Sequence, residues 1–360
     1  MDLYILSEPL FVQSPWYKTI SMGLVSELAR KKLSYTDCSI ETLMQGSFGE
    51  AFAFLLGTNV NWLNDCISEC ERLSIHPIVL STRIDSDICG TCSSVSSNLA
   101  HSMNYLLSHL CASGKTRTAL YGVNKLSLTN LAQMERFVSN GIISVTCDDI
   151  YFNEGSIGDC SDMFIDNINK YDSVISVNDF ATVSLMRKLK EIGRDITIVS
   201  YGGTKLAKKY FPELLTVSMG YESFGKAAVS ICEAMNQNKT IDSLAVQVKC
   251  SIENESPSEK TGISTSHEEK RTELYNADSR FYGDSEMNDL IRIENMLLLC
   301  DEIDSEIINL LMVGYSYEEI SEKLYCALNT VKYRVRKMKE ACGCESKREL
   351  IGMIKSYCEH

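Results

Sequence analysis

The chain has 360 residues, of which 44% are hydrophobic and 23% charged, and its formal net charge is −13. Such a composition is typical of a globular protein of two domains, and the acidic balance argues against a protein that coats nucleic acid through a basic surface. The longest apolar runs are too short to span a membrane, and the first residues lack the basic start of a secretory signal, so we expect a cytoplasmic protein.

The 15 cysteines are scattered singly, as expected in a reducing compartment where Cys serves as a small core residue. Cys89 and Cys92 form a CxxC pair without the second pair that a zinc site needs, so we expect an ordinary loop there and no bound metal. The histidines have no metal-ligand spacing, and no nucleophile elbow or dinucleotide fingerprint occurs. We therefore expect neither a cofactor nor an enzyme.

Residues 1–250 alternate short apolar runs with amphipathic stretches. The strands that we predict lie at residues 3–6, 77–80, 117–121, 172–176, 196–200 and 243–249. The helices that we predict lie at residues 16–31, 99–111, 128–139 and 181–192. Repeated strand–helix units of this length predict an α/β fold with parallel sheets and helices on both faces.

Residues 251–285 contain eight acidic and four basic residues and few apolar ones. A segment of this composition cannot supply a core face, so we predict a polar linker between two domains.

Residues 286–360 predict an all-α domain with a helix-turn-helix. A helix that starts near residue 301 carries apolar residues from Ile303 to Leu311 and ends at Gly314, a residue suited to a left-handed cap. Ser316 and Glu319 form a capping box that starts a short second helix, and a turn at residues 325–327 leads to a third helix that ends at Gly343. Ser346 and Glu349 form a second capping box before the last helix. Four helices with a tight turn between the middle pair predict a DNA-reading unit.

The third of these helices is basic in an acidic protein. Five of the ten residues from 330 to 339 are Lys or Arg, and none is acidic. Val331, Val335 and Met338 have the spacing of a buried face. Lys332, Arg336 and Lys339 would then share an outward face, with Arg334 and Lys337 beside it. Such a helix can enter a major groove and contact phosphates and base edges. The alternative is a solvated charged face without a partner.

Residues 300–355 resemble the LuxR/GerE class of helix-turn-helix domains. The resemblance rests on residues 314–324, on Thr330-Val331-Lys332, and on Gly343 with Glu349-Leu350. It implies that the helix beginning near Thr330 reads DNA and that the last helix contributes to a homodimer. The DNA-binding residues implied are Thr330, Lys332, Tyr333, Arg334, Arg336 and Lys337. The sequence departs from the class at Ala327, where a hydroxyl cap is usual, at Ile303, where a basic residue is usual, and at Arg334, where histidine is usual.

Residues 1–250 resemble the periplasmic-binding-protein-like sensor domain of the lactose-repressor and ribose-binding family. The matching segments are Ser14-Pro15-Trp16-Tyr17, Pro77 to Leu80 followed by Arg83, Val177 to Ala181, Ile198 to Tyr201, and Pro212 to Val217. The resemblance implies two α/β lobes around a cleft. We expect the chain to cross between the lobes near Gly122, near Val217 and before Val246.

The same resemblance implies a ligand site between the lobes. Its residues would be Ser14, Trp16, Tyr17, Thr82, Arg83, Gln133, Asn178, Gly202 and Met219. Trp16 and Tyr17 could stack on a ligand or could simply pack in the core, and Arg83 and Asn178 could hydrogen-bond it. Two acids usual in the family are replaced by Thr82 and Gly202, so the effector would be a sugar, a more apolar or anionic small metabolite, or absent.

These patterns predict a transcription regulator that senses a small molecule in its first domain and binds DNA through its last. The alternative is a regulator whose first domain only dimerises or binds a protein partner.

Overall fold

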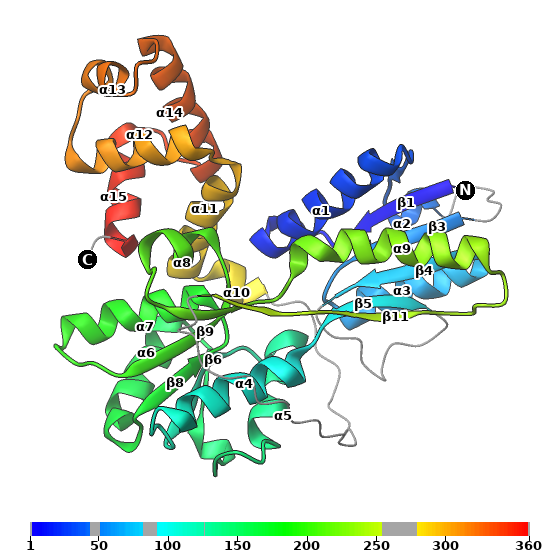
Figure 1. Ribbon diagram of the computed structural model, residues 1–360, viewed down its shortest axis with the longest axis horizontal. Coiled ribbons are helices and arrows are strands. Elements are labelled where there is room, and N and C mark those ends of the chain that lie inside the picture. Colours follow the sequence, from blue (N-terminus) through cyan, green and yellow to red (C-terminus); the bar gives the residue numbers. More distant parts are fainter. Residues whose placement is uncertain (1, 44–50, 82–91, 126, 254–278, 359–360) are drawn as a thin grey trace.

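The computed structural model describes residues 2–43, 51–81, 92–125, 127–253 and 279–358 (Figure 1). Two six-stranded sheets form two lobes, and a group of helices follows them. The sheets are parallel except at β12, the last strand, which runs antiparallel to β10. The predicted α/β architecture with an additional helical domain is confirmed.

Lobe 1 contains the sheet ordered β11-β5-β4-β3-β1-β2. Its strands are β1 (Asp2–Ser7), β2 (Thr36–Asp37), β3 (Ala51–Leu56), β4 (Ile75–Leu80), β5 (Ser93–Ser97) and β11 (Ala245–Val248). Its helices are α1 (Pro15–Lys31), α2 (Ile40–Leu43), α3 (Val60–Arg72) and α9 (Phe224–Gln237). Helices α1 and α9 pack on one face and α3 on the other, so every residue of the central β3 is buried and its sequence is continuously apolar.

Lobe 2 contains the sheet ordered β12-β10-β9-β8-β6-β7. Its strands are β6 (Thr118–Val123), β7 (Ile150–Phe152), β8 (Ser173–Ser176), β9 (Thr197–Gly202), β10 (Leu215–Ser218) and β12 (Ser251–Glu253). Its helices are α4 (Leu99–Ala112), α5 (Leu128–Val138), α6 (Ile157–Asn167), α7 (Asp179–Glu191) and α8 (Lys205–Tyr210). Helices α4 and α5 cover one face, and α6 and α7 cover the other.

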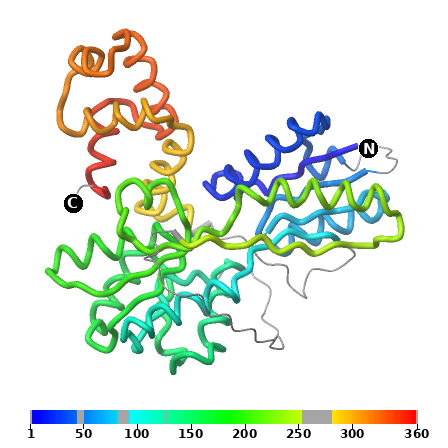
Figure 2. Tube along the Cα trace, in the orientation of Figure 1, coloured from blue at the N-terminus to red at the C-terminus, as the bar shows by residue number. Residues whose placement is uncertain are grey.

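The chain crosses between the lobes at Asn98, at Gly220 and between β11 and β12 (Figure 2). The crossing segments contact one another: the Ser97 hydroxyl donates to the Met219 carbonyl, and the Asn98 amide donates to the Val248 carbonyl. The crossing expected near Val217 is therefore nearly right. The crossing expected near Gly122 is wrong, because α4 packs its apolar face on lobe 2 and the chain has already crossed before it. The crossing expected before Val246 is also wrong, because β11 still pairs with β5 of lobe 1.

In the part of the chain that the structure describes, six helices follow the lobes. They are α10 (Ser279–Gly283), α11 (Ser285–Leu299), α12 (Glu302–Val313), α13 (Tyr317–Lys323), α14 (Leu328–Cys342) and α15 (Lys347–Cys358). The segment interpreted as a linker thus contributes β12 at its start and α10 at its end, while residues 254–278 lie outside the described part. Within the described ranges, no helix is long and apolar enough to cross a membrane.

The ends of α12 to α15 follow the predicted capping. Gly314 and Gly343 adopt left-handed conformations at the ends of α12 and α14, and both bonds of the Ser316–Glu319 capping box are present. Ser346 accepts the Glu349 amide, although the Glu349 carboxylate accepts the Glu345 amide and not that of Ser346. Ala327 makes no side-chain cap, as its methyl group dictates.

Candidate DNA-binding helices and interlobe surface

Helices α12, α13 and α14 pack on one another, and residues 324–327 form the short connection between α13 and α14. Val331, Val335 and Met338 of α14 are buried, as their spacing predicts. Tyr325 in the turn adopts a φ of 51° and is 97% exposed. The outer sides of α13 and α14 are not covered by the lobes (Figure 1).

The exposed face of α14 is cationic and aromatic. Five of the six predicted DNA-binding residues are exposed there: Thr330, Lys332, Tyr333, Arg336 and Lys337. Arg336 and Lys337 each lie 5.3 Å from the centre of the Tyr333 ring, so both cations make cation–π contacts with the same ring. The pair between Arg336 and Glu340, at 3.7 Å between exposed groups, is weak and leaves Arg336 able to find another anion.

Arg334, the sixth residue, is used inside the domain. Its Nη1 donates to Asp301 at 2.9 Å and to Asp304 at 2.8 Å, and its side chain is 24% exposed. The Asp304 and Asp301 carboxylates raise the pKa of Arg334. The Asp304 amide and the Arg334 guanidinium, which both donate to Asp301, lower the pKa of Asp301. Arg334 thus ties α14 to the first turn of α12, where Asp301 is the N-cap.

We expect Arg334→Ala to lower the free energy of unfolding by about 1 kcal/mol, because it leaves the mostly covered Asp304 carboxylate without its cation. Lys332→Ala removes the same charge from an exposed position of the same helix and should change stability by less than about 0.5 kcal/mol. Urea denaturation of the two variants measures the difference. Equal stability of the two would refute the structural role of Arg334.

The predicted ligand residues that the structure describes lie around the junction of the lobes, and most of them are used internally. The buried Ser14 hydroxyl caps α1 by accepting the Tyr17 amide, and the Tyr17 hydroxyl lies 3.1 Å from that of Ser7. Gln133 is buried and donates to the Val177 carbonyl. Asn178 caps α7, and Met219 is buried at a lobe crossing. Thr82 and Arg83 lie outside the described residues, as do residues 89–91 of the CxxC segment.

Gly202 lies against Asp179, a residue that was not predicted for this site. A Cβ at Gly202 would be 2.4 Å from the Asp179 carboxylate, and the φ of Gly202 is 151°. Asp179 is fully buried, and it accepts hydrogen bonds from Ser200, Thr204 and Thr216. Burial raises the pKa of Asp179 although these bonds oppose the rise. The network joins the ends of β9 and β10 to the start of α7, which is a structural use of the carboxylate.

Trp16 lies where the two lobes and the C-terminal helices meet. Its ring centre is 5.8 Å from that of Phe180 in lobe 2 and 6.0 Å from that of Phe281 in α10. Trp16 therefore packs against aromatic side chains of the chain itself. Phe281 belongs to the segment interpreted as a linker, so sequence patterns gave no sign of it.

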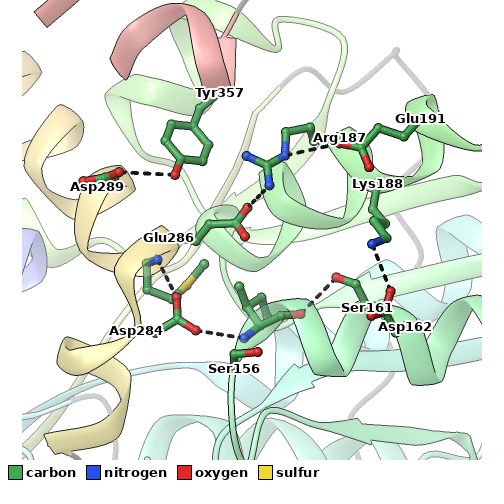
Figure 3. Close-up of polar contacts among 12 residues, drawn as sticks. Ser156, Ser161, Asp162, Arg187, Lys188, Glu191, Asp284, Glu286, Asp289 and Tyr357 are labelled. Carbon is green, nitrogen blue, oxygen red and sulfur yellow. Dashed lines mark hydrogen bonds and ion pairs between the residues drawn. The ribbon is translucent and has the colours of Figure 1, made fainter. Parts of the chain in front are cut away.

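Helix α11 packs on lobe 2 through charged groups (Figure 3). Arg187 of α7 pairs with Glu286 at 3.3 Å and lies over the Tyr357 ring, and the Tyr357 hydroxyl donates to Asp289. Asp284 accepts the Ile157 amide at the start of α6. These contacts fix the C-terminal helices against the carboxyl-end edge of the second sheet.

Glu294 is the most buried acid of this interface. It is 2% exposed, and its two carboxylate oxygens accept the amides of Lys205 and Leu206 at 2.9 and 2.7 Å. Burial raises its pKa from 4.5 to about 7, and the two backbone bonds and Lys205 only partly oppose this.

A carboxyl with a higher pKa in the folded chain binds more protons there than in the unfolded chain, so stability falls as pH rises from about 4.5 to about 7. The full loss is about 3 kcal/mol. Glutamine does not ionise, so we expect Glu294→Gln to lose this pH dependence, and its stability relative to the wild type should rise between pH 4.5 and pH 7. Urea midpoints across this pH range test this. A difference between the two proteins that does not change with pH would contradict it.

No family model and no curated protein matches the sequence. Solved structures match its fold. The cellobiose complex of the transcriptional regulator CelR has a TM-score of 0.57 and 12% identity, over 70% of this chain and 82% of that chain. The Lac repressor bound to ONPG has a TM-score of 0.56 and 15% identity, over 70% and 80%. The LacI-family regulator CCPA of Weissella paramesenteroides with bound sucrose has a TM-score of 0.55 and 17% identity, over 70% and 96%.

At these identities the likeness concerns the fold alone. It confirms the predicted two-lobed, periplasmic-binding-protein-like architecture, to which the two sheets and three crossings also conform.

Proposed function

We propose that this protein is a transcription regulator that binds duplex DNA through α13 and α14. The observation that carries the proposal is the outer face of α14, where Lys332, Arg336 and Lys337 are exposed around Tyr333 in a chain of net charge −13. Cations gathered on the second helix of a helix-turn-helix suit a groove lined by phosphates. The resemblance of residues 300–355 to LuxR/GerE domains supports the same assignment, and it makes a homodimer on paired half-sites the expected form.

The two lobes are proposed to be a sensor for a small molecule. Proteins of similar fold are described as regulators, and three of them carry cellobiose, ONPG or sucrose. A sugar or another small metabolite bound between the lobes would change how the paired DNA-binding helices are held. We propose no catalytic step, because the described polar side chains around the junction cap helices or form hydrogen bonds that link strands to loops.

A second candidate is a scaffold that dimerises or binds a protein without sensing a ligand. The observation that favours it is the internal use of Ser14, Gln133, Asn178 and Met219 at the junction of the lobes. The solved neighbours with bound sugars favour the sensor.

Replacing Lys332, Arg336 and Lys337 by Gln should lower DNA affinity at least about 100-fold, because a phosphate that no cation neutralises keeps its counterions on the DNA. The duplex is selected from a random library with the full chain, and binding is followed by fluorescence anisotropy at several salt concentrations. The slope of log affinity against log salt should fall by about 0.9 for each phosphate that the variant no longer neutralises.

The matched control replaces three exposed lysines of the lobes, Lys170, Lys190 and Lys226, by Gln. It changes the net charge equally and should leave the affinity close to that of the wild type. Equal losses of affinity in both triple variants would mean that overall charge, and not α14, governs binding, and would overturn the assignment.

A ligand of the lobes should raise the thermal midpoint of the full chain. At about 100 times its dissociation constant it adds about 2.7 kcal/mol, which corresponds to a shift of several degrees. The panel contains sugars, nucleosides, amino acids and organic acids. In a Trp62→Phe variant, Trp16 is the remaining tryptophan, so a ligand of the junction should also change the emission. A panel without any shift favours the scaffold.

A further inference from the structure

Helices α10 and α11, here called the strap, cover the edge at which ligands of α/β sheets bind. In such sheets the binding region lies outside the carboxyl ends of the strands. The strap contacts Trp16, in the segment after β1, and Ile157, Phe180 and Leu206 lie in the segments after β7, β8 and β9. Ile157 and Leu206 bond to the strap directly, and Phe180 reaches it through Trp16. In Figure 1 the strap runs between α1 of lobe 1 and α8 of lobe 2.

Charged groups attach the strap to lobe 2. Glu294 holds the first two amides of α8, and the Lys205 ammonium returns to the carbonyl end of α11, donating to Leu297 at 3.1 Å. Arg187 pairs with Glu286, and Asp284 holds the first amide of α6. To free this side, contacts with α6, α7 and α8 would have to break together, so this side is the firmer one.

Neutral groups attach the strap to lobe 1. The Asn295 amide donates to the Gln13 carbonyl at 3.2 Å, and the Phe281 ring lies against Trp16. A single neutral hydrogen bond and a single aromatic pair each contribute little to stability. Movement between the lobes would therefore separate the strap from lobe 1 before lobe 2.

The strap also holds the DNA-binding helix. Arg292 of α11 donates to the carbonyls of Cys342 and Gly343, which are the last turn and the cap of α14. A cation at this end also suits the helix dipole. A Cβ at Gly343 would be 3.2 Å from the Arg292 guanidinium, so the two are closely fitted.

We propose that the strap is an internal occupant of the interlobe surface and couples the lobes to α14. The Phe281 ring lies against Trp16, and a ligand that stacks on Trp16 at this place must displace it. Release of the strap from lobe 1 then shifts α11. Through Arg292, this shift moves the last turn of α14. This inference rests on the proposed function, since it describes how sensing would reach the DNA-binding face.

The test uses the full chain in the Trp62→Phe background. Phe281→Ala with Asn295→Ala removes both lobe 1 contacts. The matched control is Met22→Ala with Met163→Ala, two side chains that are 54% and 49% exposed on α1 and α6. Backbone hydrogen exchange followed by mass spectrometry reports on each helix, and Trp16 emission reports on its exposure.

The double variant should move Trp16 emission to longer wavelength and speed exchange at least about tenfold in α11 and in the last turn of α14. The control should do neither. Arg292→Ala should speed exchange in the last turn of α14 while Trp16 emission stays unchanged. A shift of Trp16 emission with unchanged exchange in α11 and α14 would overturn the coupling.

If β3 and β8 also lose protection, the double variant has unfolded, and Phe281→Leu alone then decides: faster exchange in α11 supports the proposal, and unchanged exchange overturns it. Exchange is measured without DNA. Failure of the coupling is therefore distinguishable from failure of DNA binding, which the α14 variants test separately.

Discussion

Burial of α11 on nearly its whole circumference is the constraint on which the arrangement of the domains depends. Eight of its fifteen residues are buried, including Glu294 and Asn295 as well as apolar side chains. A helix that is buried all round must lie between bodies and not on the surface of one. Because α11 packs on α1, α7, α8 and α14 at once, helices α12 to α15 are held against the lobes through it.

The sequence predicted those parts of the fold that local patterns determine. Gly314, Gly343 and Ser316 mark helix ends because caps use only residues near them in the chain. Strand β5, by contrast, is Ser-Ser-Val-Ser-Ser, and its buried serines give no apolar run to recognise. β5 is the last strand of lobe 1 before the first crossing, so a prediction that misses β5 places this crossing too late along the chain. The third was misplaced for a related reason, since only pairing with β5 shows to which lobe β11 belongs.

The residues of the candidate sites also differ in whether local sequence patterns predict their positions. The exposure of Lys332, Arg336 and Lys337 follows from helical spacing alone. The pairing of Arg334 with Asp301 and Asp304 depends on contacts across some thirty residues of sequence, and no local pattern reports it. The position of Phe281 is still harder to predict, because this residue lies in a segment whose composition resembles that of a solvated linker. Its place beside Trp16 is a property of the packed domains.

The distribution of charge has a consequence for encounters in solution. The exposed cations of α14 form a local basic face in a chain whose net charge is −13, and α14 lies at one end of the molecule (Figure 1). A polyanion is therefore attracted by this face and repelled by the acidic surface around it. Approach is then oriented before any contact forms, and fewer collisions present the wrong face. Added salt, which shortens the range of these forces, would slow the encounter as well as weaken the complex.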